Sequence, residues 1–254
     1  MVAVETGVER KADLVMLQEP PEGRGGIGIS HSLYEIRKRK RVWTAVRQAS
    51  GLATDKRTDL SRGANDDVIV TDVQRGGEKM TRIINVHDQR DVRTGERLAR
   101  KINCSRIIRQ RGSTILAGDF NAPSRRWDPR CKEQRNATVW EEILDEHGLE
   151  IGNDDQAAHH WARNGDEGEL TIDLTSTSRP ITRWTILDGR HTSGSDHDVI
   201  EWEFSVDKQE EADHVQVIGC NLAAMSKEDE KAAEKLWEKL EGQRGRLDEE
   251  CTGD

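Results

Sequence analysis

Acidic and amide side chains follow two short apolar runs of this sequence, at the points where buried strands would end. Asp119 and Asn121 come after the run Thr114–Gly118, and Glu19 lies near the end of the run Ala12–Pro20. Polar side chains are costly in a core unless they are paired, so a shared rim at strand ends is a favourable place for them. Carboxylate and carboxamide oxygens suit Mg²⁺, which keeps waters that a substrate phosphate can replace. The pattern therefore indicates a magnesium site that binds a phosphate.

Imidazole and carboxyl groups recur at similar positions later in the chain. His87 ends the run Thr81–His87, Asp173 lies within a further strand-like segment, and Asp196 with His197 precedes the last alternating run. An imidazole beside the carboxylates can move a proton or donate to a phosphoryl oxygen. A second buried carboxylate would fix the tautomer of that imidazole.

Each of these motifs also has a purely structural interpretation. Glu19 can simply terminate a strand, Gly118–Asn121 can be an Asx-type turn, and Ser195–His197 can cap a loop. The order of the motifs along the chain, rather than any one of them, favours the functional interpretation.

The elements that would position these residues are mostly strands. Apolar runs and alternation predict strands at Ala12–Pro20, Val42–Val46, Asp67–Val73, Thr81–His87, Thr114–Gly118, Thr171–Thr177, Arg183–Asp188 and Asp198–Val206. Helical spacing predicts helices over 98–108, from about Thr138 to Gly148, and over Ser226–Gly242. Many strands with few helices predict two stacked sheets with the helices outside.

Four segments, taken in order, resemble motifs of the endonuclease/exonuclease/phosphatase (DNase I-like) superfamily. They are Leu17–Pro20, Gly118–Pro123, Thr171–Thr175 and Gly194–Ile200, and the resemblance extends from Ala12 to Val206. Within that superfamily, the Gly118–Asp128 segment with Trp127 is similar to the endonuclease domain of fungal LINE-type, non-LTR retrotransposons. The resemblance implies a four-layer α/β sandwich, in which two mixed β-sheets pack face to face between outer helices.

The resemblance also implies a role for each matching residue. Glu19 and Asp196 would lie at the metal, which would be Mg²⁺ with Mn²⁺ as an alternative. Asp119 would orient or deprotonate the attacking water, and Asn121 and His197 would hold the scissile phosphate. The remaining roles fall to Asp173, which would support His197, and to His87, which stands where the family usually has tyrosine.

One family element has no counterpart at the expected place in this sequence. The family's first strand, which carries an asparagine and often contributes to the metal site, does not precede Ala12–Pro20. The sequence therefore predicts a domain, residues 1–206, whose first strand is missing.

Basic residues occur in two groups that could contact nucleic acid. Arg125, Arg126 and Arg130 follow the Gly118–Asn121 turn closely, and we expect phosphate contacts from them. The run Arg37–Arg41 could contact phosphates or act as a nuclear address, but a solvated strand edge is the favoured interpretation.

Net charge and cysteine spacing limit the other possibilities. The chain has a formal net charge of −9, and residues 207–254 hold 14 acidic and 7 basic residues, so we expect an acidic, partly helical connector there. The four cysteines form no CxxC pair, which favours reduced thiols in an intracellular protein. No apolar run reaches membrane-spanning length and no secretory signal is evident, so we expect no membrane association.

These features together predict a Mg²⁺-dependent DNA-nicking endonuclease that leaves 3′-hydroxyl ends on chromosomal target DNA, located in the nucleus. The full element would also carry a reverse-transcriptase domain, which this sequence lacks. Two alternatives remain open: a catalytically impaired remnant of such an element, and a phosphatase or phosphodiesterase of the same superfamily.

Overall fold

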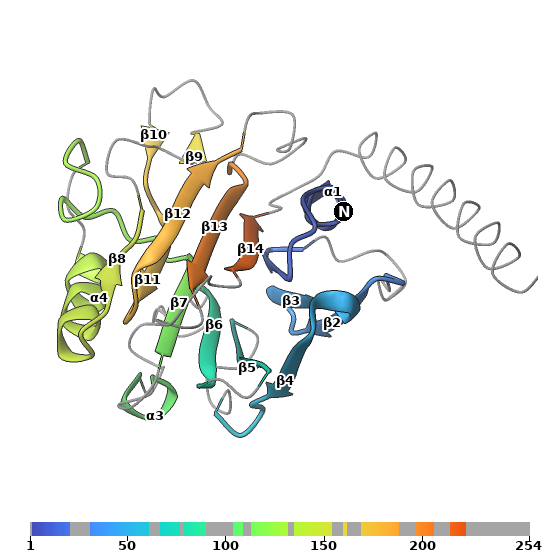
Figure 1. Cartoon of the computed structure of the whole chain (residues 1–254). Coiled ribbons are helices and arrows are strands. Elements are labelled where there is room, and N and C mark those ends of the chain that lie inside the picture. The colour runs from blue at the N-terminus through green and yellow to red at the C-terminus, as the bar shows by residue number, and fades with distance from the viewer. Residues whose placement is uncertain are drawn as a thin grey trace, which may run out of the picture.

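The computed structural model describes the chain as two β-sheets packed face to face (Figure 1). The described residues are 2–20, 31–60, 67–76, 79–89, 104–108, 113–131, 135–153, 160–161, 169–187, 197–205 and 214–221. Each sheet has one parallel pairing among antiparallel ones, β1 with β14 and β6 with β7, so both are mixed. The predicted α/β sandwich of two mixed sheets is confirmed.

The first sheet has six strands in the order β12-β13-β14-β1-β3-β2. Their bounds are β12 Ile181–Ile186, β13 Ile200–Ser205, β14 His214–Asn221, β1 Leu14–Gln18, β3 Val42–Arg47 and β2 Tyr34–Lys38. The second sheet has the order β4-β5-β6-β7-β11-β8. Its strands are β4 Leu52–Lys56, β5 Val68–Arg75, β6 Thr81–His87, β7 Ser113–Asp119, β11 Asp173–Thr177 and β8 Glu150–Ile151. A separate pair joins β9 His160–Trp161 to β10 Glu169–Leu170.

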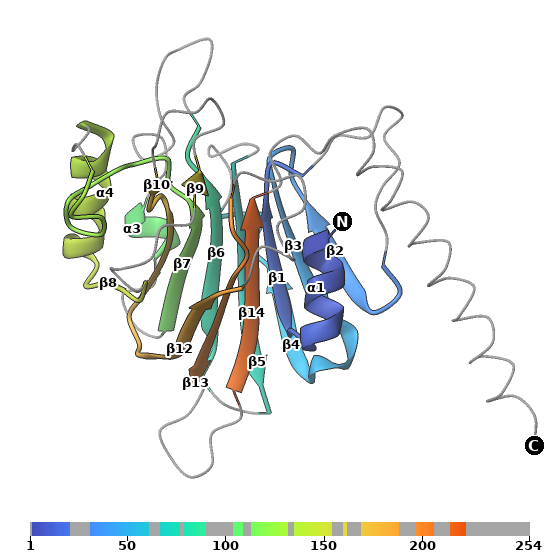
Figure 2. The same cartoon turned by 90° about the horizontal axis from the view of Figure 1, so that it is seen from above.

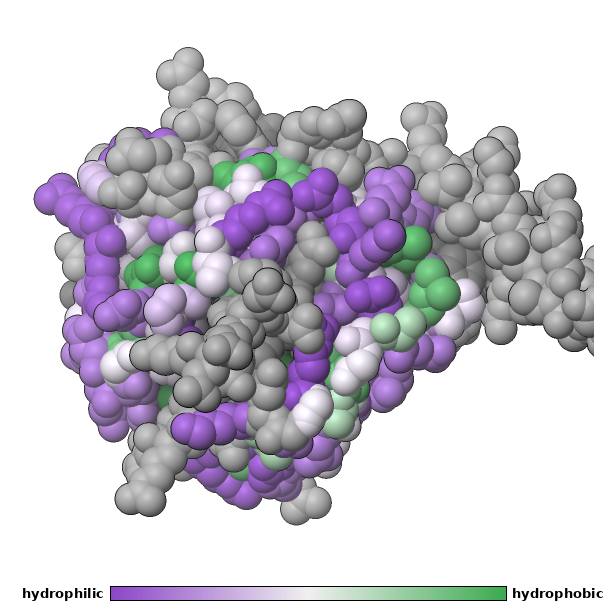
Figure 3. All heavy atoms as spheres, viewed as in Figure 1, coloured by the Kyte–Doolittle hydropathy of each residue, from purple (hydrophilic) through white to green (hydrophobic). Residues whose placement is uncertain are grey.

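Helices lie outside the two sheets. Among the described residues they are α1 Val2–Arg10, α3 Cys104–Ile107, α4 Arg135–Glu146 and the 3₁₀ turn η1 Gln48–Ser50. Figures 1 and 2 place α1 and α4 at opposite sides of the molecule. No helix of the described part is long and apolar enough to cross a bilayer. The face seen in Figure 3 is coloured hydrophilic over most of its described residues.

The sequence of β1 is an unbroken apolar run because both faces of the strand are buried. Leu14 and Met16 belong to the cluster between the sheets, whereas Val15 and Leu17 belong to the cluster beneath α1. A strand covered on both sides shows no apolar–polar alternation. The outer cluster beneath α4 includes Trp140, which lies edge-on to Phe120 with ring centroids 4.6 Å apart.

The strand β14 changes the predicted domain boundary. It lies between β13 and β1 (Figure 2), pairing parallel with β1 and antiparallel with β13. The sheet therefore continues to Asn221, past the boundary predicted at residue 206. For the same reason β1 is not an edge strand, because β14 from later in the chain lies beside it. The absence of the family's first strand before Ala12 stays a prediction.

Several other element predictions need smaller adjustments. The helix expected from about Thr138 begins at Arg135, and of the helix expected over 98–108 the structure describes only Cys104–Ile107. The edge strand β4 is not among the predicted elements. The helix predicted over Ser226–Gly242 lies outside the described residues.

Candidate active site

Three neighbouring strands of the second sheet bring their polar residues into one row. Asp119 ends β7, where it is in register with His87 of β6 on one side and Asp173 of β11 on the other. All three side chains are buried. Glu19, one residue past β1, comes from the opposite sheet, and His197 lies just before β13. Residues far apart in sequence therefore meet at one edge of the sandwich.

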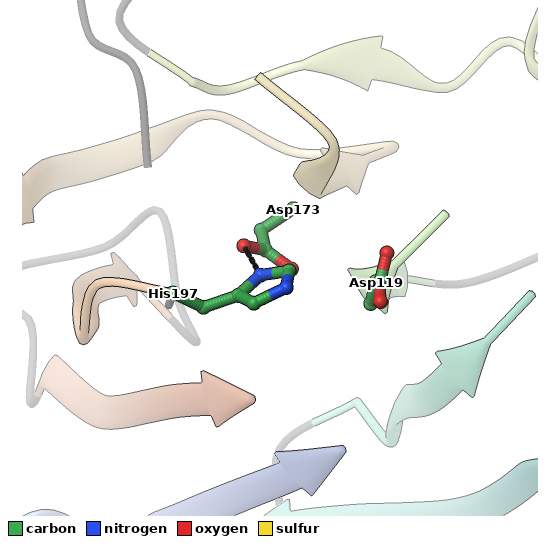
Figure 4. A group of neighbouring side chains, drawn as sticks. All are labelled: Asp119, Asp173 and His197. Atoms are coloured by element: carbon green, nitrogen blue, oxygen red, sulfur yellow. Dashed lines mark hydrogen bonds and ion pairs between the residues drawn. The ribbon is translucent and has the colours of Figure 1, made fainter. Parts of the chain in front are cut away.

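A hydrogen-bonded carboxylate–imidazole pair forms one half of the site. The Nδ1 atom of His197 is 2.6 Å from Oδ2 of Asp173. In Figure 4 the imidazole ring lies between Asp173 and Asp119, and one ligand-type atom from each of the three residues lies within 4.8 Å of the others. With Nδ1 donating to the carboxylate, the ring presents Nε2 as its other functional nitrogen. This arrangement suits a residue that binds a phosphoryl oxygen or transfers a proton.

Asp119 is held by the turn that follows it. The backbone N–H of Asn121 donates to Oδ1 of Asp119 at 2.8 Å, and its Nδ2 donates to Oδ2 at 2.7 Å. Asn121 has a φ of 45°, and Glu19 has a φ of 47°, both in the left-handed region that is costly for residues with a Cβ. Gly118 has a φ of 137°, and a Cβ on it would lie 2.0 Å from the carbonyl oxygen of Val86. Glycine at position 118 and the two Asn121–Asp119 hydrogen bonds therefore set the geometry of this turn.

His87 links the two sheets at the site. Its Nε2 is 3.3 Å from Oε1 of Glu19 and 3.6 Å from Oδ2 of Asp119. Directly beneath this contact, Nε2 of Gln18 donates to Oδ1 of Asn85 at 2.7 Å, and Asn85 in turn donates to the backbone oxygen of Trp43. These buried bonds fix the residues before Glu19 and His87 relative to each other.

Burial shifts the pKa of two of these groups in opposite directions. Desolvation, reinforced by the nearby carboxylate of Asp173, raises the pKa of Asp119 to about 8. Desolvation and the positive charges of Arg41 and His197 lower the pKa of His87 to about 4. Without a cation, burial therefore favours the protonated form of Asp119 and the neutral form of His87.

Several segments that form this site match known nucleases. Residues 81–201 match the family model described as Endonuclease-reverse transcriptase. The endonuclease domain of TRAS1, a telomere-specific non-LTR retrotransposon, has a similar solved structure, with a TM-score of 0.64 and 16% identity over 83% of this chain and 92% of that one. An endonuclease/exonuclease/phosphatase family protein from Leptotrichia buccalis is also similar, with a TM-score of 0.53 and 14% identity over 79% of this chain and 90% of that one. The chain is therefore similar to this family over residues 81–201, and it has the fold of the endonuclease/exonuclease/phosphatase proteins.

A third similar structure has been solved together with DNA. It is the 3′ phosphatase NExo from Neisseria bound to product DNA hairpin, with a TM-score of 0.51, 16% identity, and coverage of 79% of this chain and 92% of that one. At such low sequence identities, the similarity to these solved structures shows a shared fold. Comparison with curated proteins gives no match.

The donor set of this site fits a hard divalent cation. Asp119 is a buried carboxylate whose pKa is raised, and the Glu19 carboxylate lies on the other side of His87 with 30% of its side chain exposed. A cation would relieve the repulsion among these acids, and oxygen donors select Mg²⁺ or Mn²⁺ over softer metals. Asp196, the other predicted metal ligand, lies outside the described residues.

The three arginines predicted to contact nucleic acid differ in their surroundings. Arg126 pairs with Asp145 of α4 at 2.8 Å, and Arg130 pairs with the buried Asp128 at 2.9 Å. These contacts occupy both guanidinium groups within the protein. Arg125 is exposed and pairs with none of the described carboxylates, so it is the one of the three that is best placed to meet a phosphate.

A residue that sequence reasoning did not include lies at the same edge. The register of β14 aligns Asn221 with Gln18, the residue before Glu19. On the other side, β14 pairs Gly219 with Ile200 of β13, so its end points toward the segment that follows His197. The signal was the strand-favouring segment Val215–Ile218, with three β-branched residues, within an otherwise charged stretch.

Replacing Asp119 with asparagine should make the metal-free protein less sensitive to rising pH. The native pKa of Asp119 is about 8, whereas an ordinary value is 3.8, so between these values the native state holds a proton that the unfolded state has lost. The free energy of unfolding of the wild type should therefore fall as pH rises through this window. Thermal melts in EDTA should show a difference in Tm, Asp119→Asn minus wild type, that grows by several degrees from about pH 5 to pH 8.5.

The low pKa of His87 changes the free energy of unfolding in the opposite direction, and it does so over a lower pH range. Its native pKa of about 4 favours the native state as pH rises from about 4 to 6.5, and this contribution is present in both proteins. A difference in Tm that stays constant over the whole range would contradict the raised pKa of Asp119.

Proposed function

We propose that this chain is a divalent-metal-dependent endonuclease that nicks DNA and leaves 3′-hydroxyl ends, as the endonuclease of a non-LTR retrotransposon. The observation that carries the proposal is the convergence of Asp119, the Asp173–His197 pair and the Glu19–His87 pair at one edge of the sandwich. Structural likeness to the TRAS1 endonuclease domain supports the choice of substrate class.

Each residue has a role in phosphodiester cleavage that its surroundings support. A bound Mg²⁺ would supply charge stabilisation on the phosphoryl group, and Glu19 would hold it together with Asp196. Asp119 orients the attacking water and accepts its proton. Asn121, whose Nδ2 donates to Oδ2 of Asp119, lies beside it and would donate to the scissile phosphate.

His197 acts on the phosphate from the side opposite to Asp119. Asp173 holds its Nδ1 proton, so Nε2 is the atom that donates to the phosphoryl oxygen as negative charge develops there. As the bond between phosphorus and the 3′ oxygen breaks, this oxygen takes a proton from solvent water, and the resulting 3′-hydroxyl would serve as the primer for reverse transcription in the full element.

The impaired remnant is a second candidate, and one observation favours it. His87 is neutral, buried and short where the family usually has a phenol. The other reason for this candidate is the expected absence of the family's first strand; in the structure β14 pairs with β1 on that side of the sheet.

Plasmid nicking tests the proposal directly. Supercoiled DNA incubated with the protein and Mg²⁺ should convert to open circles, with no conversion in EDTA. Asp119→Ala should abolish conversion, and His87→Tyr separates the two candidates. Nicking by the wild type supports the enzyme, whereas no nicking by the wild type together with nicking by His87→Tyr identifies the remnant. An inactive wild type and an inactive His87→Tyr would refute nuclease function.

A further inference from the structure

The turn between β2 and β3 lies at the same edge of the sandwich as the active site. β1 pairs Gln18 with Val42 at the start of β3, and the backbone N–H of Glu19 donates to the carbonyl oxygen of Arg41 at 2.9 Å. Asp67, which pairs with Arg41, accepts a bond from the backbone N–H of His87. The basic run predicted to be a solvated strand edge therefore borders the site itself.

Four cations of this region gather along two facing edge strands and the turn that follows one of them. Arg37 lies on β2 and Lys56 on β4, and Nη2 of Arg37 donates to Oγ1 of Thr54 across the gap between the sheets. Figure 1 shows β2 and β4 on the same side of the molecule. Arg39 and Lys40 lie in the turn that leads from β2 toward Arg41. We call these four residues, Arg37, Arg39, Lys40 and Lys56, the basic edge.

Carboxylates neutralise little of the basic edge. Glu35, whose side chain is 62% exposed, is the only described acid that pairs with it, through Nε of Arg37 at 3.1 Å. Arg39, Lys40 and Lys56 pair with none of the described carboxylates. Nη1 of Arg37 and Nε of Arg39 are buried without a hydrogen-bond partner among the described residues. By contrast, Arg41 beside them forms a two-point ion pair with Asp67.

Like charges held this close raise each other's free energy. Burial lowers the pKa of Lys56, and the charges of Arg39 and Arg37 lower it further. A surface that concentrates cations without matching acids stabilises a bound polyanion, because each phosphate removes part of this repulsion. The net charge of the chain is −9, so this local excess of positive charge is not a property of the whole surface.

We propose that the basic edge binds the phosphodiester backbone of duplex DNA on the β2–β3 side of the scissile phosphate. The proposal rests on the proposed function, because it names the surface that the substrate of that site would follow. Arg39, Lys40 and Lys56 contact phosphates beyond the cleavage position, while Arg41 stays with Asp67 and shapes the rim next to Glu19. The contacts are to backbone and carry no base preference.

Binding without catalysis tests this surface separately from the chemistry. The wild type, Lys40→Gln/Lys56→Gln and the control Lys11→Gln/Lys79→Gln are titrated in EDTA against a fluorescent DNA duplex at several salt concentrations. The control removes the same charge from the opposite edge, where Lys11 precedes β1 and Lys79 precedes β6. Loss of two phosphate contacts should flatten the slope of log affinity against log salt by about 1.8 and weaken binding by roughly tenfold at moderate salt. The control should keep the wild-type slope.

The outcomes distinguish this proposal from the proposed function. Equal weakening in the two double variants, or no binding by the wild type, overturns the basic edge as a DNA surface. If the wild type nicks plasmid but Lys40→Gln/Lys56→Gln binds as tightly as the control, the function stands and this inference fails. If binding depends on the basic edge but no nicking occurs, this inference stands without the nuclease. A duplex RNA of the same sequence, run in parallel, should bind more weakly; stronger binding to RNA refutes DNA as the ligand.

Discussion

Replacing His197 with alanine should lower the nicking rate by about 10³-fold, within the range of a positioned acid–base group. The imidazole is buried, its Nδ1 is bound to Asp173 at 2.6 Å, and its ring lies between Asp173 and Asp119. Alanine removes the only imidazole on this side of Asp119 within the described residues, and no neighbouring group replaces its donor. The rate of conversion of supercoiled to open-circle plasmid at saturating Mg²⁺ measures the effect.

Two comparison variants show whether His197 acts on the phosphate or only supports the fold. Asp173→Asn should lower the rate by about 10–100-fold, because it keeps the shape of the pair and weakens only the support of the ring. His147→Ala, at the end of α4, should leave the rate unchanged. If His197→Ala retains a rate within threefold of the wild type, or if its loss is matched by an equal loss of folded protein in thermal melts, the assigned role is wrong.

The acidic residues at the site could be predicted because the end of a strand can be recognised from neighbouring residues in the sequence. An apolar run that leads into Asp119 and Asn121 indicates a buried strand and the polar turn after it, and neither feature depends on the rest of the fold. The same holds for Glu19 after β1. The register that sets Asp119 beside both His87 and Asp173 is a long-range property, and only the resemblance to a known family, not the pattern of residues, predicts it.

Pairing partners of charged side chains could not be predicted from the sequence. Arg126 and Arg130 are equivalent to Arg125 in the sequence, yet these two are bound to Asp145 and Asp128. The run at residues 37–41 has the pattern of an ordinary solvated edge, because nothing local indicates that β4 brings Lys56 to it. Charge patterns along a chain give the number of cations, but the fold decides which of them acids neutralise.

The position of β14 could not be predicted for a related reason. Its apolar run is short and lies between acidic stretches, and composition alone assigns such a stretch to a connector. A parallel partner for β1 can come from any distance along the chain, because parallel pairing requires no tight turn. The sheet, rather than the local composition, therefore sets the end of this domain.

Truncation after Val206 should prevent the protein from folding stably. It removes β14, which pairs with five residues of β1 and six of β13 in the middle of the first sheet. At about 1 kcal/mol net for each lost backbone hydrogen bond and roughly one bond for each paired position, the cost is on the order of 10 kcal/mol, before any loss of buried apolar area. This is comparable with the whole stability of a typical domain, about 5–15 kcal/mol. Circular dichroism and thermal melts of the purified truncated chain measure the outcome.

A second truncation, after Met225, is the matched control, because it retains every described element including β14. We expect it to melt cooperatively and to keep the nicking rate of the full chain. Val217→Pro in the full-length chain should reproduce the defect of the shorter truncation, since Val217 is in register with Leu14 on one side and Trp202 on the other, and proline cannot donate within a central strand. If the chain ending at Val206 melts and nicks like the chain ending at Met225, β14 is dispensable, and residues 207–254 form the connector that their charge suggests.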